Sequence, residues 1–229
     1  MVKLVLFDID GTLIRTGGAG VRAFERTFAE QFGLVEATKT LKFSGRTDVS
    51  LVRECFGQHR IEPNEMNFRR FFENYPRHLE SLLGTLPEGI CEGIEPFMAD
   101  LIYVENPPLL GLLTGNVRRG AELKLKHFGL WEKFVTGAFA DDHEDRNCIA
   151  AVAKQRGEKI LGRELSGDEI VVIGDTPLDV LCARSIAAKA LAVSTGNFTR
   201  AELAESKPHW AVENVSQITA AEVLGRNGR

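Results

Sequence analysis

Residues 4–13 read LVLFDIDGTL, in which four apolar residues run directly into Asp8, Asp10, Gly11 and Thr12. A short continuous apolar run bounded by a polar turn is typical of a buried strand in a parallel sheet. Side chains two residues apart on an extended backbone point to the same side. The segment therefore predicts a buried first strand with two carboxylates together where it ends.

Four later apolar runs repeat this pattern, each followed by a polar turn. They are residues 109–113 before TGN, 134–139 before DDHED, 170–173 before GDTP and 190–193 before STGN. Such runs, alternating with helical patterns of ten or more residues, indicate βαβ units. We predict an α/β fold, with a Rossmann-like parallel sheet core and helices on both faces. In such folds ligands bind at the carboxyl ends of the strands.

Residues 15–85 show a different pattern, because apolar side chains recur there at helical spacing. Among them are Phe24, Phe28 and Phe32 and, further along, Phe68, Phe71, Phe72 and Tyr75. Glycine-containing stretches at 17–20 and 86–89 flank the segment. We predict an all-helical cap domain over residues 15–85, inserted into a catalytic core made of residues 1–14 and 86–229.

Composition narrows the possible partners of the chain. Its 28 basic and 32 acidic residues give a formal net charge of −4, so there is no basic excess for nucleic-acid binding. No apolar run approaches the length of a signal-peptide core or a membrane span. The four cysteines are dispersed, as expected of reduced thiols. We expect a soluble cytoplasmic protein with no nucleic-acid, membrane or obligate protein partner.

A second pair of carboxylates, Asp175 and Asp179, follows the strand at 170–173. Converging carboxylates repel one another and are costly to bury unless a cation neutralises them. Oxygen ligands of this kind suit Mg²⁺, which also binds substrate phosphate oxygens. The sequence thus predicts a Mg²⁺ site made by Asp8, Asp10, Asp175 and Asp179. The alternative for each pair is a turn in which Asp caps backbone donors.

Thr114, Gly115 and Asn116 follow another strand and precede a helix. A hydroxyl and free amides at a helix N-terminus form a site for phosphate, although an ordinary N-cap uses the same residue types. The tripeptide recurs at 195–197, so by itself it does not discriminate. Only its order among the other motifs favours the first copy.

Taken in order, DIDGT at 8–12, TGN at 114–116, a basic residue at 146 and GDTPLD at 174–179 resemble the haloacid dehalogenase superfamily. The chain is most similar to its phosphoglycolate-phosphatase-like group, in which a helical cap follows the first motif. The resemblance covers nearly the whole chain and implies a hydrolase of phosphoric monoesters. Dehalogenases of the superfamily lack the second Asp, so Asp10 argues against dehalogenation.

The resemblance also implies roles for individual residues. Asp8 would attack phosphorus and form an aspartyl-phosphate, and Asp10 would act as general acid and then general base. Neighbouring carboxylates would favour the protonated form of Asp10 that the first duty needs. The metal would be held by the carboxylates of Asp8 and Asp175 and the backbone carbonyl of Asp10, with Asp179 steadying its waters. Thr114 would hold phosphoryl oxygens. The implied substrate-binding residues are Gly11, Thr12, Arg46, Gly115 and Asn116.

The chain departs from the family at one position. The family usually supplies a lysine at the start of the helix that follows the strand ending near Ala140, where this sequence has Arg146. Arginine carries the same charge on a bidentate fork, so the role is chemically feasible. Lys154, about two turns further along, is the competing candidate, and a surface position for Arg146 is the structural alternative.

The cap contains the segment FSGRTD at residues 43–48. Thr47 or Asp48 can cap a helix that starts near Val49. Similar members carry this stretch facing the active site, where Arg46 could clamp an anionic part of the substrate. A solvated arginine at a helix start explains Arg46 equally well.

Three functions are consistent with these residues. The first is a Mg²⁺-dependent phosphatase acting on a small phosphorylated metabolite, either phosphoglycolate-like or a sugar phosphate. The second is a phosphomutase of the β-phosphoglucomutase type, which would return the phosphoryl group to a sugar and require a bisphosphate primer. The third is a non-catalytic binding module, against which the intact set of acidic residues argues.

Overall fold

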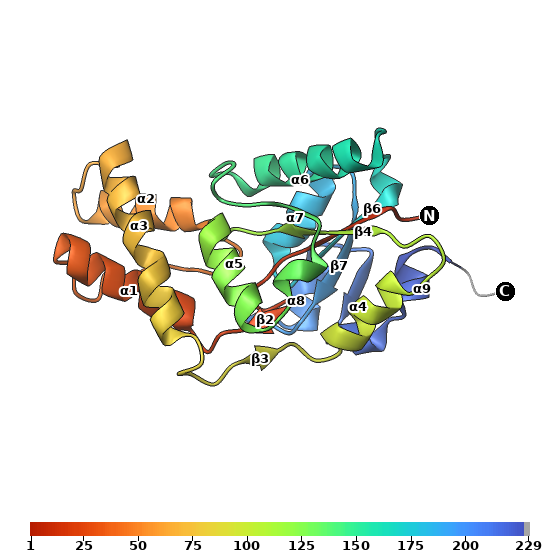
Figure 1. The fold of residues 1–229 in the computed structure, drawn as a ribbon, viewed down its shortest axis with the longest axis horizontal. Helices are drawn as coiled ribbons and strands as arrows, with labels where there is room; N and C mark the ends of the chain where they lie inside the picture. The colour runs from red at the N-terminus through yellow and green to blue at the C-terminus, as the bar shows by residue number, and fades with distance from the viewer. Residues whose placement is uncertain (227–229) are drawn as a thin grey trace.

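The computed structural model describes residues 1–226 and confirms the predicted α/β fold (Figure 1). Six strands form one parallel sheet in the order β5-β4-β1-β6-β7-β8. The strands are β1 (Leu4–Phe7), β4 (Leu109–Leu113), β5 (Thr136–Ala138), β6 (Ile170–Gly174), β7 (Lys189–Val193) and β8 (Trp210–Val212). Because β1 pairs with both β4 and β6, its carboxyl end lies at the middle of the ligand-binding edge.

Helices cover both faces of this sheet. On one face lie α4 (Ile94–Ile102), α5 (Arg118–His127) and α9 (Ala220–Val223); on the other lie α6 (Arg146–Leu161), α7 (Pro177–Ser185) and α8 (Arg200–Glu205). Alternation along β1 explains the arrangement, since Val5 and Phe7 belong to the first of these cores and Leu4 and Leu6 to the second. A strand buried on both faces is therefore apolar throughout.

Some elements differ from the predicted ones. Three 3₁₀ turns were not predicted: η1 (Trp131–Lys133), η2 (Gly167–Glu169) and η3 (Val215–Gln217). Only three residues of the apolar run at 134–139 form strand β5, because η1 precedes it and the Phe139 amide turns to bond Asp142 Oδ2 at 2.9 Å. The edge strand β8 was also missed, because three half-buried residues leave no pattern to recognise.

Three helices form a cluster apart from the sheet: α1 (Ala19–Phe32), α2 (Asp48–Gln58) and α3 (Glu65–Leu82). Figure 1 shows them at one end of the long axis, with the N-terminus at the other. Their core is aromatic, built around Phe24, Phe28, Phe56 and Phe71. The chain enters through β2 (Ile14–Arg15) and returns through β3 (Gly89–Ile90), which pair antiparallel. The domain boundaries at 14/15 and 85/86 stay a prediction.

Backbone contacts tie the helical cluster to the sheet edge. The Asp48 amide donates to the Gly115 carbonyl at 2.7 Å, and the Val117 amide donates to Asp48 Oδ2 at 2.8 Å. At Gly120 of α5, an added Cβ would lie 3.2 Å from the Tyr75 ring, so α3 and α5 pack closely. These contacts place the cluster over the carboxyl ends of the strands. Within residues 1–226 no helix combines the length and apolarity needed to cross a membrane.

Candidate active site

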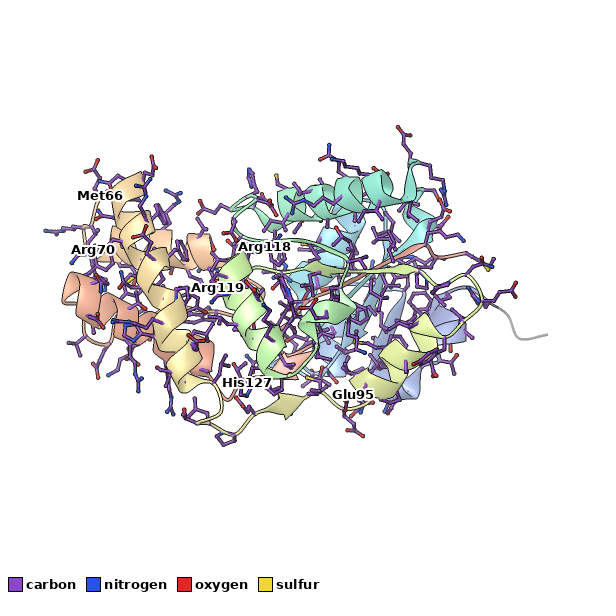
Figure 2. The ribbon with its side chains drawn as sticks, in the orientation of Figure 1. Met66, Arg70, Glu95, Arg118, Arg119 and His127 are labelled. Carbon is purple, nitrogen blue, oxygen red and sulfur yellow. The ribbon has the colours of Figure 1, made fainter. Side chains whose placement is uncertain are left out.

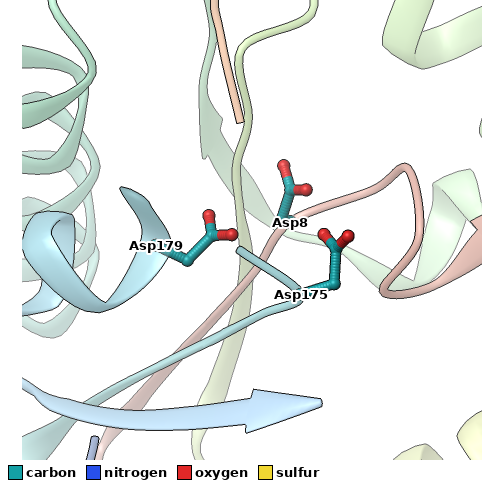
Figure 3. A group of neighbouring side chains, drawn as sticks. All are labelled: Asp8, Asp175 and Asp179. Atoms are coloured by element: carbon teal, nitrogen blue, oxygen red, sulfur yellow. The ribbon is translucent and has the colours of Figure 1, made fainter. Parts of the chain in front are cut away.

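Three buried carboxylates meet at the centre of the sheet edge (Figure 3). Asp8 directly follows β1, Asp175 follows β6, and Asp179 lies in the first turn of α7. One oxygen from each lies within 4.8 Å of the others. Gly196 packs directly against Asp175, and only glycine fits at that position, because an added Cβ would lie 1.7 Å from Asp175 Oδ2. The structure thus brings together three of the four predicted metal-site carboxylates.

The electrostatics of this cluster favour a bound cation. Burial raises the pKa of Asp8 to about 6, with repulsion from Asp179 adding to the effect although Arg146 opposes it. Burial and the charges of Asp179 and Asp8 raise the pKa of Asp175 to about 9. Arg146 by itself therefore does not compensate the negative charge of the three carboxylates. An all-oxygen donor set with this charge fits a hard divalent ion such as Mg²⁺.

Arg146, the first residue of α6, lies against this cluster. Its Nη2 lies 2.9 Å from Asp8 Oδ1 and also forms an ion pair with Asp179, while Nη1 donates to the Gly45 carbonyl at 3.2 Å. Lys154 lies elsewhere: its side chain is 29% exposed and its ammonium is 3.8 Å from Glu158. The structure therefore places Arg146, and not Lys154, beside Asp8.

The predicted phosphate turn follows β4, the strand that pairs with β1, and lines the same cavity as Asp8. Thr114 directly follows β4 and is fully buried, and Asn116 Nδ2 donates to its Oγ1 at 2.8 Å. A Cβ at Gly115 would lie 2.2 Å from the Arg46 carbonyl, so cap backbone lies directly on the turn. The second TGN copy, at 195–197, also borders the cavity. Position in the structure therefore distinguishes the two TGN copies less clearly than their order in the chain does.

A cavity of about 400 Å³ opens between the sheet edge and the cap. Its walls include these candidate residues: Asp8, Asp10, Gly11, Arg46, Thr114, Gly115, Asn116, Arg146 and Asp175. Thr12 and Asp179 lie behind the wall. The Thr12 hydroxyl donates to Asp175 Oδ1 at 3.3 Å, and Asp179 accepts from the Thr176 hydroxyl at 2.7 Å. Asp179 also accepts from the Thr176 backbone amide at 3.0 Å in the capping box of α7, as the alternative interpretation expected, and it pairs with Arg146.

The cap segment at 43–48 reaches this cavity. Thr47 caps α2 by accepting from the Ser50 amide at 3.3 Å. Arg46 borders the cavity, but its guanidinium forms an ion pair with Glu54 of α2. A substrate anion would have to compete with that carboxylate. Whether Arg46 clamps substrate therefore stays a prediction.

Sequence reasoning missed one charged residue of the site, Lys124 on α5. Its ammonium lies 2.6 and 2.8 Å from the two carboxylate oxygens of Asp10 and 2.7 Å from Asn116 Oδ1. A positive charge therefore adjoins Asp10, whereas only neighbouring carboxylates were expected there. The available signal was that Lys124 falls on the apolar stripe of its helix, in line with Ala121 and Leu125.

Comparisons with known proteins agree with this geometry. A family model described as haloacid dehalogenase-like hydrolase matches residues 5–193. The chain is 24% identical over 223 residues to "Putative pyrophosphatase PpaX" of Clostridium perfringens, covering 95% of this chain and 96% of that protein. It is also 24% identical over 228 residues to a phosphoglycolate phosphatase of Agrobacterium fabrum, covering 95% and 91%.

A solved structure supports the fold assignment. It is described as a predicted phosphoglycolate phosphatase from Haemophilus somnus and superposes with a TM-score of 0.74 at 18% identity. The match covers 99% of this chain and 98% of the other. At that identity the likeness concerns the fold, which is the same sheet and helical arrangement.

Proposed function

The chain belongs to the haloacid dehalogenase-like hydrolase family, and we propose that this member is a Mg²⁺-dependent phosphatase of small phosphomonoesters. Of the relatives that match along nearly the full length, one is named a pyrophosphatase and another a phosphoglycolate phosphatase, and the second name is that of a hydrolase of phosphoric monoesters. The observation that carries the proposal is the meeting of Asp8, Asp175 and Arg146 beside the Thr114 turn. Nucleophile, cation site and phosphate donors then share one cavity.

Asp8 is the nucleophile in this proposal. Arg146 bonds its Oδ1, so Oδ2 is the oxygen that we assign to attack on phosphorus. The new bond joins Asp8 to phosphorus while the bond from phosphorus to the ester oxygen breaks, and its electron pair leaves with the alkoxide. Asp10 gives that alkoxide a proton, then takes one from the water that hydrolyses the aspartyl-phosphate. Inorganic phosphate and the free alcohol are the products.

The Asp8 and Asp175 carboxylates and the Asp10 backbone carbonyl would hold Mg²⁺, with Asp179 behind them. When bound, the ion supplies the positive charge that offsets repulsion between a carboxylate nucleophile and a phosphate dianion. Arg146 fixes the orientation of Asp8 and adds one charge of its own. The Thr114 hydroxyl and the Gly115 amide hold the phosphoryl oxygens, because the Val117 and Arg118 amides at the start of α5 already donate to Asp48 and Asp141.

The size of the cavity limits the substrate. A space of about 400 Å³ admits a phosphate with a small organic group, in the range of phosphoglycolate or a sugar phosphate. The cap side of the wall is mixed. Val21, Phe24 and Phe43 are apolar, whereas Ser44, Arg46 and Asp48 are polar or charged. We infer a small metabolite as substrate, and not a phosphorylated macromolecule.

A phosphate-release screen over a panel of phosphorylated metabolites, with and without Mg²⁺, tests the proposal. We expect metal-dependent release from several small phosphomonoesters. We also expect loss of nearly all turnover in Asp8→Asn, which keeps the shape of the side chain but removes the nucleophile. Undiminished turnover in Asp8→Asn would refute the assigned nucleophile. Turnover that appears only with a sugar bisphosphate primer would instead indicate a mutase.

A further inference from the structure

Lys124 is a buried lysine at the cavity, and the mechanism above gives it no duty. The residue is 4% exposed, and lysine is rarely buried unless its charge is matched. The structure supplies three acceptors for its ammonium: both carboxylate oxygens of Asp10 and Oδ1 of Asn116, at 2.6 to 2.8 Å. Its exposed neighbours on α5, Arg118, Arg119 and His127, lie on the outer side of the helix (Figure 2).

The contacts of Lys124 determine how the Asp10 carboxyl is held. The Asp10 side chain is 44% exposed, and it follows β1 in a turn. Its oxygens accept hydrogen bonds from Lys124 Nζ and, at 2.8 Å, from Asn116 Nδ2. The same Asn116 amide bonds the Thr114 hydroxyl at 2.8 Å. A single network therefore connects the general acid to the phosphate turn.

Cap helices close over this network. A Cβ at Gly20 of α1 would lie 3.5 Å from Lys124 Nζ and 3.9 Å from the Tyr75 hydroxyl of α3. The ammonium is thus enclosed by residues of both the cap and the core. Because Lys124 can move little in such packing, it can fix the position of a partner that is itself partly exposed.

We propose that Lys124 is a positioning residue that aims the Asp10 carboxyl at the ester oxygen of the substrate. The inference rests on the proposed phosphatase function and deepens it. Lys124 does not itself transfer a proton or bind phosphorus. It limits the freedom of the group that protonates the leaving alkoxide, and a misplacement of about 1 Å there costs on the order of 100-fold in rate.

This role has a chemical signature that a merely structural role lacks. An alkoxide is a poor leaving group and needs the proton from Asp10, whereas dinitrophenolate is stable enough to leave without one. If the Asp10 carboxyl is misplaced, the rate of reaction therefore falls far more for alkyl phosphates than for activated aryl phosphates. The informative quantity is kcat/KM, because it reports the steps through transfer to Asp8 and excludes later hydrolysis of the aspartyl-phosphate.

The experiment compares Lys124→Met with the wild type on a series of phosphomonoesters, from alkyl phosphates to 2,4-dinitrophenyl phosphate. Methionine keeps much of the length of the side chain and removes its charge. We expect kcat/KM to fall by about 100-fold for alkyl phosphates and by less than about 10-fold for the dinitrophenyl ester. In Asp10→Asn, the logarithm of kcat/KM should depend on the pKa of the leaving group with the same slope as in Lys124→Met. The double variant should lose no more than Asp10→Asn alone.

Lys126→Met is the matched control, since Lys126 lies on the same helix, is exposed and pairs with Glu122. Lys126→Met should leave kcat/KM unchanged for every ester of the series. Equal fractional losses across the series in Lys124→Met would overturn the positioning role. Circular dichroism checks the fold, and Lys124→Gln takes its place in the same comparison if the Met variant does not fold. Absence of turnover in the wild type on every ester would instead refute the phosphatase function itself.

Discussion

At the scale of single residues, one guanidinium organises two carboxylates. Arg146 Nη2 contacts both Asp8 and Asp179, while Nη1 reaches the Gly45 carbonyl of the cap segment. A planar fork can bond several acceptors in fixed directions, which a compact ammonium cannot do as well. The arginine at this position is therefore compatible with the role usually given to lysine. It also adds a contact to the cap.

Comparison of Arg146→Ala with Lys154→Ala tests this assignment. We expect Arg146→Ala to lower kcat/KM by about 100-fold or more, because Asp8, the proposed nucleophile, loses its orientation and the phosphoryl group loses a positive charge. Lys154→Ala should stay within about twofold, since the Lys154 ammonium approaches only the half-buried Glu158, at 3.8 Å, and lies away from Asp8. Phosphate release measures both variants. A larger loss in Lys154→Ala would move the basic role to that residue.

At the scale of elements, the loop before α2 lies directly on the phosphate turn. The Asp48 amide bonds the Gly115 carbonyl, and the Thr47 hydroxyl donates to the Glu144 carbonyl at 2.8 Å, two residues before Arg146. Segment 45–48 therefore contacts both loops that contribute to the site. Placement of α2 and the geometry of the site depend on one another.

A small substitution in the turn tests this dependence. In Gly115→Ala the added methyl would lie 2.2 Å from the Arg46 carbonyl, so the cap segment must move away from the turn. We expect kcat/KM to fall by at least about tenfold on every substrate, because the donors that hold phosphate shift with the turn. Steady-state phosphate release is the measurement.

Gly57→Ala on α2 is the matched control. A Cβ there meets no atom within 4 Å among the described residues, and alanine favours the helix by up to about 1 kcal/mol. It should leave kcat/KM unchanged and slightly raise the melting temperature. Wild-type activity in Gly115→Ala would show that the cap tolerates displacement from the turn.

At the scale of the whole molecule, folding gathers carboxylates whose negative charge the neighbouring Arg146 does not fully balance. The central place of β1 brings Asp8 beside residues more than 160 positions away in sequence. The helical cluster covers that edge and takes the carboxylates out of water. Stability is therefore linked to pH and to cation binding.

The sign of the pH dependence follows from the raised pKa values. The Asp carboxyl has an ordinary pKa of 3.8, and the folded chain raises it to about 6 at Asp8 and about 9 at Asp175. Between 3.8 and these values the folded chain holds protons that the unfolded chain has released. In chelator, the contribution of this site to the free energy of unfolding should therefore fall as pH rises from about 4 to 9. Mg²⁺ at pH 8 should restore stability by binding the ionised carboxylates.

Thermal unfolding of the wild type and Asp175→Asn across this pH range, in chelator and in Mg²⁺, checks the prediction. In chelator, the melting temperature of Asp175→Asn should rise relative to that of the wild type as pH rises, because the variant has no carboxyl at position 175 to ionise. Addition of Mg²⁺ should raise the melting temperature of the wild type more than that of Asp175→Asn, because the variant lacks a charged ligand. Parallel behaviour of the two proteins in both media would contradict a cation site at Asp175.

The parallel sheet, its two helical faces and the helical segment after β1 follow from patterns within short windows of sequence. Apolar runs that end in Asp or Thr-Gly-Asn, and aromatic residues at helical spacing, encode strands and helices locally. The same patterns named Asp8, Asp175 and Thr114 as candidates, since the carboxyl ends of parallel strands meet at one edge. Short or weakly patterned elements, β2, β3 and β8, left no such trace.

Tertiary packing settled the partners of the charged side chains. The choice between Arg146 and Lys154 beside Asp8, and the pairing of Arg46 with Glu54, depend on where helices lie relative to the sheet. The contact of Lys124 with Asp10 joins residues 114 positions apart. Hydrophobic periodicity is a property of neighbouring residues, whereas the position of an ammonium over a distant carboxylate arises only when α5 is packed between cap and sheet.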